Sequence, residues 1–219
     1  MRRTAIAAAV VALAAAGCAA DPPAGTVGIR VTSSCSTGSP TASGMVVGPG
    51  LVLTAAHPLR GAREIVVRRD GVDVPAEIVA FDPEMDLAYL AIAGPTAAPM
   101  PIDSDHVDPG DPATAWVVRA GQPVAVRATV QRRVRINTED IYVDGETTRP
   151  GFELMADIEP GDSGAAVVVD GTLAAVVWAK SRRATGRAWA IDPDRGGGLI
   201  DEQLRTGRLG DDVSLVRCR

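Results

Sequence analysis

Short apolar runs separated by two-residue turns occupy most of this chain of 219 residues. The runs are rich in Val, Ile and Leu, and the pairs between them contain Gly. A Gly-containing pair between two such runs is typical of an antiparallel hairpin, because Gly takes the positive φ that tight turns need. The pattern therefore predicts an all-β fold. The candidate turn pairs are Pro49-Gly50, Asp70-Gly71, Asp144-Gly145 and Asp170-Gly171.

The predicted strands fall into two halves, joined by a Pro-, Ala- and Asp-rich stretch at about 95–112 that is typical of a linker. We place the first half at about 26–94, the second at about 113–192, and a C-terminal tail with one helix, at 200–208, in 193–219. About six strands in each half would fit either two barrels or a β-sandwich. The predicted strands are 27–32, 44–48, 51–54, 64–68, 72–74, 76–81, 87–92, 114–119, 124–136, 141–143, 152–155, 165–169, 173–178 and 187–191.

Composition indicates a folded protein without a nucleic-acid partner. Hydrophobic residues make up 46% of the chain and charged residues 22%, which is typical of a globular domain. Aromatic residues make up only 3%, so the core must be built mainly from Val, Ala, Leu and Ile. The formal net charge of −5 argues against binding to nucleic acid, which favours a basic surface.

The first residues resemble an export signal. Arg2 and Arg3 precede an uncharged apolar run at 4–16, which is too short to cross a bilayer and ends in small residues. We therefore assign 1–17 as a signal peptide and 18–25 as a tether, and we expect the mature protein to lie outside the cytoplasm.

Cys18 gives this signal two alternative outcomes. The stretch 13–18 resembles a bacterial lipoprotein box, in which the Cys becomes the lipidated first residue and attaches the protein to the membrane, although Ala15 stands where Leu is preferred. Ordinary cleavage, for example after Ala20, would instead release a soluble secreted protein. We expect the lipidated form.

The three cysteines indicate one disulfide. If Cys18 is lipidated or removed, Cys35 and Cys218 remain as a pair, and an oxidising compartment permits them to bond. The alternative is two free thiols. The chain has no Cys-x-x-Cys pair and only two His residues, so we expect no metal site and no cofactor.

Three segments carry residues suited to nucleophilic catalysis. Ser163 lies in a Gly-Asp-Ser-Gly sequence before an apolar run, His57 follows another apolar run, and Asp86 begins a third. Ser is a weak nucleophile that needs a nearby base, and the base needs an acid to orient it. In the order His, Asp, Ser these segments resemble the trypsin/chymotrypsin-like serine proteases. The sequences Asp-Leu-Ala-Tyr-Leu at 86–90 and Pro-Gly-Asp-Ser-Gly at 160–164 are similar to the compact bacterial HtrA-like branch.

This resemblance covers about 27–191 and implies a chymotrypsin-like fold: two six-stranded antiparallel β-barrels, here followed by a short C-terminal helix. Residues 26–219 would then form the serine protease domain. Too few residues follow the second barrel for the PDZ domain that the HtrA-like branch often carries.

The resemblance also implies a role for each residue of the catalytic set. Ser163 attacks the scissile carbonyl, His57 takes the Ser proton and later returns it to the leaving amine, and Asp86 orients the imidazole. The N–H groups of Gly161 and Ser163 bind the developing oxyanion. His106 is the other possible base in the chain, and its place in the linker makes it the weaker candidate.

Further positions bear on the substrate. Asp157 stands six residues before Ser163, where trypsin-like relatives carry the Asp that selects Arg or Lys, whereas the HtrA-like branch prefers small aliphatic side chains. Val177 and Trp178 lie in a run that resembles the strand to which substrates add, although an ordinary core strand has the same pattern. In pancreatic-type relatives the Asp before the nucleophile, which corresponds to Asp162 here, pairs with a newly cut N-terminus. Nothing here resembles that activation sequence, so we expect Asp162 to bind an Arg or to face water.

Together these features predict an exported, lipid-anchored serine endopeptidase that acts on polypeptides. The alternative is a non-catalytic binding or scaffold module on the same fold. An ester hydrolase of the α/β-hydrolase class is disfavoured, because its Ser, Asp, His order and its Gly-x-Ser-x-Gly sequence are absent.

Overall fold

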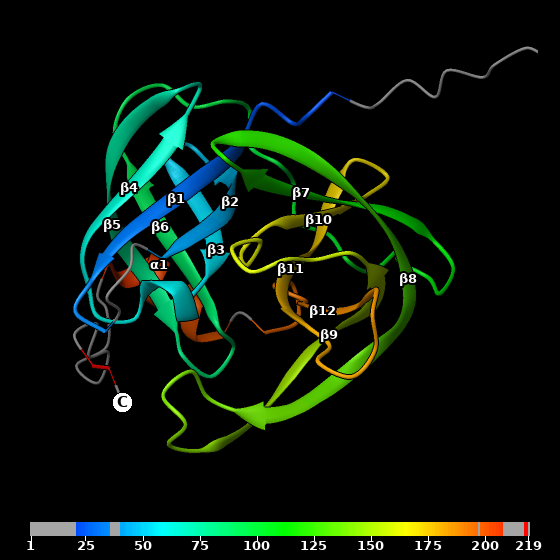
Figure 1. The fold of residues 1–219 in the computed structure, drawn as a ribbon. Helices are drawn as coiled ribbons and strands as arrows, with labels where there is room; N and C mark the ends of the chain where they lie inside the picture. The colour runs from blue at the N-terminus through cyan, green and yellow to red at the C-terminus, as the bar shows by residue number, and fades with distance from the viewer. Residues whose placement is uncertain (1–20, 36–39, 197, 208–216, 219) are drawn as a thin grey trace, which may run out of the picture.

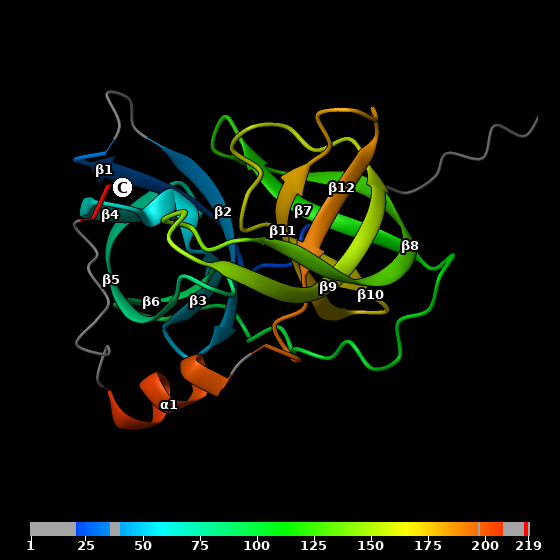
Figure 2. The same ribbon diagram turned by 90° about the horizontal axis from the view of Figure 1, so that it is seen from below.

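The computed structural model describes residues 21–35, 40–196, 198–207 and 217–218. Within these ranges twelve strands form two closed six-stranded antiparallel barrels, which lie side by side in Figures 1 and 2. The all-β, chymotrypsin-like fold predicted from the sequence is confirmed. The predicted signal peptide at 1–17 and Cys18 lie outside the described residues. No helix of the described part of the chain is long and apolar enough to cross a membrane.

Barrel one contains the first six strands, closed in the order β1-β2-β3-β6-β5-β4. The turn between its strands β4 and β5 has positive φ at both Asp70 (50°) and Gly71 (78°), as a two-residue hairpin of the type I′ class requires. A short 3-10 helix, η1 (His57–Leu59), follows β3. The strands are β1 (Thr26–Ser33), β2 (Thr41–Gly48), β3 (Leu51–Ala55), β4 (Ala62–Arg69), β5 (Val72–Asp82) and β6 (Leu87–Ile92).

Barrel two closes in the order β10-β11-β12-β9-β8-β7. The helix α1 (Gly198–Thr206) follows it in sequence but packs on β5 of barrel one, where Figure 2 shows it at the edge of the molecule. Gln203 of this helix accepts from the Phe81 N–H at 2.6 Å and donates to the Phe81 carbonyl at 3.1 Å. The strands are β7 (Pro112–Arg119), β8 (Gln122–Glu139), β9 (Glu146–Ala156), β10 (Ala166–Val169), β11 (Thr172–Lys180) and β12 (Arg187–Ile191).

Each barrel encloses its own apolar core, and a third cluster fills the seam between them. As the low aromatic content predicts, the two cores consist mostly of Val, Ala, Leu and Ile. In the seam, Met45 and Leu53 of barrel one pack with Leu173 and Val176 of barrel two. The seam fixes how the strand ends of the two barrels face each other, and the candidate site lies at those ends.

Two strand predictions are wrong. The runs 72–74 and 76–81 are one strand, because Pro75 pairs with Val66 and does not interrupt the ladder. The run 141–143 is not a strand but the loop between β8 and β9. Its apolar residues Ile141 and Tyr142 are buried in the core of barrel one, so their hydrophobicity reflects docking on the other barrel and not a place in a sheet.

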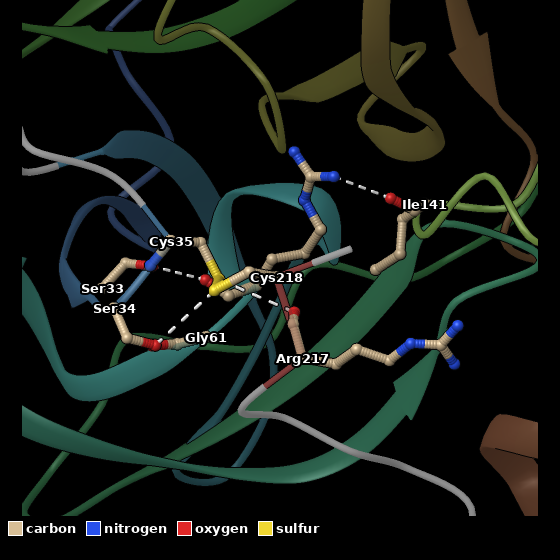
Figure 3. Close-up of a disulfide and its surroundings, with 8 residues drawn as sticks. Ser33, Ser34, Cys35, Gly61, Ile141, Arg217 and Cys218 are labelled. Carbon is tan, nitrogen blue, oxygen red and sulfur yellow. Dashed lines mark hydrogen bonds between the residues drawn. A yellow bond between two sulfur atoms is a disulfide. The ribbon is translucent and has the colours of Figure 1, made fainter.

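The predicted disulfide joins Cys35, just after β1, to Cys218 near the C-terminus (Figure 3). The two residues are 183 positions apart. In the chain-entropy model a cross-link of that span restricts the unfolded chain by about 5 kcal/mol. Close by, Arg217 lies over the ring of Tyr142 and pairs with Asp144, so the C-terminus is attached to both barrel one and the β8–β9 loop.

Candidate active site

The pairing of two neighbouring strands brings His57 and Asp86 together. His57 lies two residues after the end of β3 and Asp86 directly precedes β6, and these strands are antiparallel partners with Ala55 opposite Leu87. The end of one strand therefore lies beside the start of the other. The Ala56 N–H donates to the Asp86 carbonyl at 3.1 Å and closes the strand pair.

The Asp86 carboxylate holds His57 at two points. Its Oδ1 accepts the main-chain N–H of His57 at 2.7 Å, and its Oδ2 lies 2.9 Å from Nδ1 of the ring. The Asp86 side chain is 1% exposed, whereas His57 is 32% exposed. Burial alone would raise the pKa of Asp86, but the charge and hydrogen bonds of His57, together with the Arg149 guanidinium, lower it below its usual value. The carboxylate is therefore ionised at neutral pH and keeps Nδ1 protonated.

Ser163 completes the group from the other barrel. Its Oγ lies 3.0 Å from Nε2 of His57, within hydrogen-bond distance. The structure thus brings together the three residues that the sequence singled out, in a chain from carboxylate to imidazole to hydroxyl. The group opens onto a cleft of about 640 Å³, lined on one side by His57, Thr41 and Arg60 and on the other by Gly161 and Ser163.

A tight turn precedes Ser163. The Asp162 N–H donates to the Glu159 carbonyl at 3.1 Å, and Gly161 has a φ of 98°. Pro160 in the second position and a Gly of positive φ in the third define a type II turn. Within the described part of the chain, neither the Gly161 nor the Ser163 N–H donates a hydrogen bond. Both N–H groups are therefore free to donate to a ligand oxygen.

Close contact between the barrels fixes the segment after this turn. Gly164 has a φ of 85°, and a Cβ there would overlap the Ser43 carbonyl and the Thr54 hydroxyl of barrel one. The Ser43 N–H donates to the Ser163 carbonyl at 2.8 Å, and the Gly164 N–H donates to the Val177 carbonyl at 2.9 Å. The Gly after the Ser is therefore required by the approach of the two barrels.

Asp162 binds an Arg, which is one of the two partners that the sequence left open. Its side chain is 1% exposed and accepts from Arg119 Nε at 3.0 Å and Nη2 at 2.6 Å. It also accepts the Glu159 N–H at 2.8 Å. The Asp162 carboxylate thus stabilises the type II turn before Ser163. The N–H groups of Gly161 and Ser163 have no acceptor within the described residues.

Asp157 is exposed and not buried in a pocket base. It lines a pocket of about 200 Å³ together with Lys180, Arg182 and Arg183. Because the Asp157 side chain is exposed to solvent, it is not the unpaired buried carboxylate that would attract a basic side chain. The preference for Arg or Lys stays a prediction.

The candidate substrate strand lies beside the nucleophile. Val177 is buried, and its N–H donates to the Ala165 carbonyl at 2.9 Å. Trp178 is half-buried and its ring lies under the guanidinium of Arg149, 5.1 Å from centroid to Cζ. Substrate binding by Val177 and Trp178 stays a prediction.

His106 is occupied elsewhere, as its position in the linker suggested. Its ring contacts the Asp103 carboxylate at 3.6 Å and the Thr172 hydroxyl at 3.4 Å. No group of three or more His, Cys, Asp or Glu within the described residues is placed to hold a metal ion.

Sequence reasoning missed the supporting residues Ser43, Arg119 and Arg149. Ser43 joins the barrels, because its Oγ also accepts the Val118 N–H at 2.8 Å. Arg119 and Arg149 are each the single Arg of their strand, in a chain where 21 of the 22 basic residues are Arg, and no spacing distinguishes them. The one available signal was that Arg119 stands at the end of a predicted strand, before an Ala-Gly turn.

Comparison with known proteins gives consistent results. Residues 42–176 match the trypsin-like peptidase domain family. Serine protease Rv3671c of Mycobacterium tuberculosis (strain ATCC 25618 / H37Rv) is 33% identical over 143 residues, which are 62% of this chain and 35% of that protein. A probable periplasmic serine endoprotease DegP-like of Chlamydia pneumoniae is 27% identical over 174 residues, 76% of this chain and 35% of that protein. The chain therefore spans about a third of the length of these relatives.

Solved structures show the same fold. The crystal structure of the active form of the Rv3671c protease from M. tuberculosis superposes with a TM-score of 0.80 at 24% identity, covering 90% of this chain and 86% of that chain. The HtrA-type protease AlgW with a tripeptide superposes with a TM-score of 0.73 at 25% identity, covering 86% and 62%.

Proposed function

The chain belongs to the trypsin-like peptidase domain family, and from this premise we propose that it is a serine endopeptidase that hydrolyses polypeptides through an acyl-enzyme on Ser163. The observation that carries the proposal is the continuous contact from Asp86 to His57 at 2.9 Å and from His57 to Ser163 at 3.0 Å. Nucleophile, base and orienting acid are all within hydrogen-bond reach, as acyl transfer requires.

Each step of the reaction has a residue to perform it. His57 Nε2 takes the proton as Ser163 Oγ forms a bond to the scissile carbonyl carbon, and the carbonyl oxygen becomes an oxyanion. The N–H groups of Gly161 and Ser163 bind that oxyanion. His57 then gives its proton to the leaving amine as the C–N bond breaks, which leaves the acyl-enzyme. Water, deprotonated by His57, then attacks the ester carbon. The bond from that carbon to Ser163 Oγ breaks, Oγ takes the proton back from His57, and the acid is released.

Asp86 keeps the imidazole in the form that this sequence needs. Because Oδ2 faces Nδ1, the neutral ring carries its proton there and leaves Nε2 free to accept from Ser163. The carboxylate also stabilises the imidazolium that forms in each step. In serine proteases of this class, loss of the Asp carboxylate lowers turnover about 10⁴-fold.

The geometry supports a catalyst over a non-catalytic module on the same fold. A module without activity tolerates a collapsed turn or a His far from the Ser. Here the imidazole lies 3.0 Å from the hydroxyl, and the type II turn leaves two N–H groups free within the described residues.

The place of action that we propose is outside the cytoplasm. Relatives are named periplasmic, and a disulfide between Cys35 and Cys218 is typical of an oxidising compartment. The N-terminal sequence up to Cys18 supports export with a lipid anchor. Replacing Cys18 by Ala should move the protein from the membrane fraction to the soluble fraction, and unchanged fractionation would refute the anchor.

A fluorophosphonate probe tests the nucleophile directly. The purified protein should take up one label per chain and cleave an unstructured protein such as casein, and S163A should lose both activities. The two His residues give a matched pair: H57A should lose nearly all labelling, whereas H106A should label like the parent. Labelling that survives in S163A would falsify the assignment of Ser163. Labelling without cleavage of any peptide would refute the peptidase.

A further inference from the structure

One arginine is fully buried beside the carboxylate of the proposed catalytic triad, which consists of Asp86, His57 and Ser163. Arg149 lies on β9 of barrel two, and its side chain is 1% exposed. Arg is almost never buried to this extent unless it is paired. The burial of Arg149 therefore depends on partners that barrel two alone does not supply.

The guanidinium binds the turn that carries Asp86. Nε donates to the Glu84 carbonyl at 2.5 Å, and Nη2 donates to the carbonyls of Pro83 at 3.4 Å and Glu139 at 3.2 Å. Nη1 lies 3.9 Å from Oδ2 of Asp86, and this is the only ion pair of Arg149 within the described residues. Two of its three hydrogen-bond acceptors thus belong to the short turn of barrel one that ends in Asp86.

That turn has a conformation that needs support. Asp86 has a φ of 59°, in the left-handed region that costs a residue with a Cβ about 1–2 kcal/mol. Asp82 holds the N–H groups of the turn, because its Oδ1 accepts from Glu84 and Met85, each at 2.9 Å. Arg149 holds the carbonyls of Pro83 and Glu84, from the barrel that carries Ser163.

The other face of the guanidinium meets the candidate substrate strand. Its Cζ lies 5.1 Å from the ring centroid of Trp178 on β11, within cation–π distance. Arg149 therefore contacts the acid's turn on one side and the strand beside the nucleophile on the other. It ties together the parts of the two barrels that must keep a fixed geometry during catalysis.

We propose that Arg149 is a positioning residue for the triad: it fixes the turn at 83–86, and so sets the Asp86 carboxylate against His57 from the opposite barrel. The proposal rests on the proposed function, because it assigns Arg149 a task in that same site. The proposal predicts that substitution of Arg149 lowers activity by disturbing Asp86 and not by unfolding the protein.

A double-mutant cycle on the fluorophosphonate reaction separates these two possibilities. R149M keeps an unbranched apolar stem and removes the charge and donors, and it should lower the labelling rate constant of the bound probe about 10- to 100-fold with little change in probe affinity. In a D86N background, which labels slowly, R149M should cost less than about twofold, because the carboxylate that Arg149 positions is already absent. R149K restores the charge without the planar fork and should recover only part of the lost rate.

Arg133 supplies the matched control. It is another arginine of barrel two, pairs with the buried Asp192 at 2.5 Å and lies over the ring of Phe152 at 4.5 Å, but it makes no contact with the triad within the described residues. R133M should lose a comparable amount of thermal stability and label at the rate of the parent. If R149M does not fold, the same cycle is run with R149K.

The outcomes distinguish the two claims. A parent protein that takes up no label refutes the proposed function. A parent that labels normally, with the Arg149 substitution slowing both backgrounds by the same factor, overturns the positioning role alone. Full recovery in R149K overturns it as well, because a single ammonium group lacks the planar set of donors with which Arg149 binds several carbonyls at once.

Discussion

The two turns that carry the proposed catalytic groups each contain one buried aspartate, and the two aspartates are neutralised differently. Asp86 of barrel one and Asp162 of barrel two are equally buried, each side chain being 1% exposed. The near partner of Asp86 is the imidazole of His57, and its permanent cation is 3.9 Å away. The near partner of Asp162 is a permanent cation, Arg119, at 2.6 Å and 3.0 Å.

This difference follows from what each carboxylate must do. A bidentate Arg takes up both oxygens and holds them in one plane, which suits Asp162 because it only braces the turn of Gly161. In the mechanism that we propose, Asp86 serves a ring that gains and loses a proton in every cycle. A direct Arg bond would compete with His57 for the same oxygen, so the cation acts from a longer distance. Two equally buried aspartates thus serve different purposes. The difference depends on whether the nearest partner titrates, as His57 does, or keeps its charge, as Arg119 does.

The largest expected effect comes from D86N. The amide cannot hold the imidazole with Nδ1 protonated, so we expect turnover and the labelling rate to fall about 10⁴-fold. D162N removes a brace and not a reacting partner, and it should cost far less. Steady-state cleavage of casein-derived peptides and labelling kinetics measure both variants. Equal losses in the two would contradict the division of roles.

G161A should have the next largest effect. Its φ of 98° is strained for any residue with a Cβ, so the type II turn should relax and withdraw one oxyanion donor. Removing one such donor typically lowers kcat about 10²- to 10³-fold. G171A is the matched control, since Gly171 has a φ of 86° in a hairpin with no atom near the added Cβ. It should lose stability but keep kcat; a similar loss of kcat in both variants would show that strain alone reduces activity.

The sequence was enough for the residues that lie at strand ends. His57, Asp86 and Ser163 each stand where an apolar run meets a turn, so local pattern and family resemblance located them, and the structure brings all three together. The disulfide could be predicted because, once Cys18 is set aside, Cys35 has a single possible partner. Both inferences needed residue type and chain order, and the first also needed the resemblance to a known family.

The supporting contacts could not be predicted, because they depend on how the barrels pack. All but one of the 22 basic residues are Arg, so the sequence could say that Asp162 needs a cation but not that Arg119 supplies it. Arg149 looks like any polar residue of an exposed strand, and only the approach of barrel one buries it. The loop at 141–143 was misread for the same reason, since its apolar residues pack on the other barrel.

The smallest expected effect separates the two members of the Asp162 pair by stability. R119M leaves a buried carboxylate without a cation, and because Arg119 is 30% exposed the cost should lie at or below about 3 kcal/mol, the low end for a broken buried pair. D162N removes the buried charge and leaves an arginine that water can solvate, so it should cost less. Urea unfolding with a constant m-value measures the difference in free energy of unfolding. A D162N variant less stable than R119M would mean that the hydrogen bond from Glu159 N–H, at 2.8 Å, and not the cation, holds this turn.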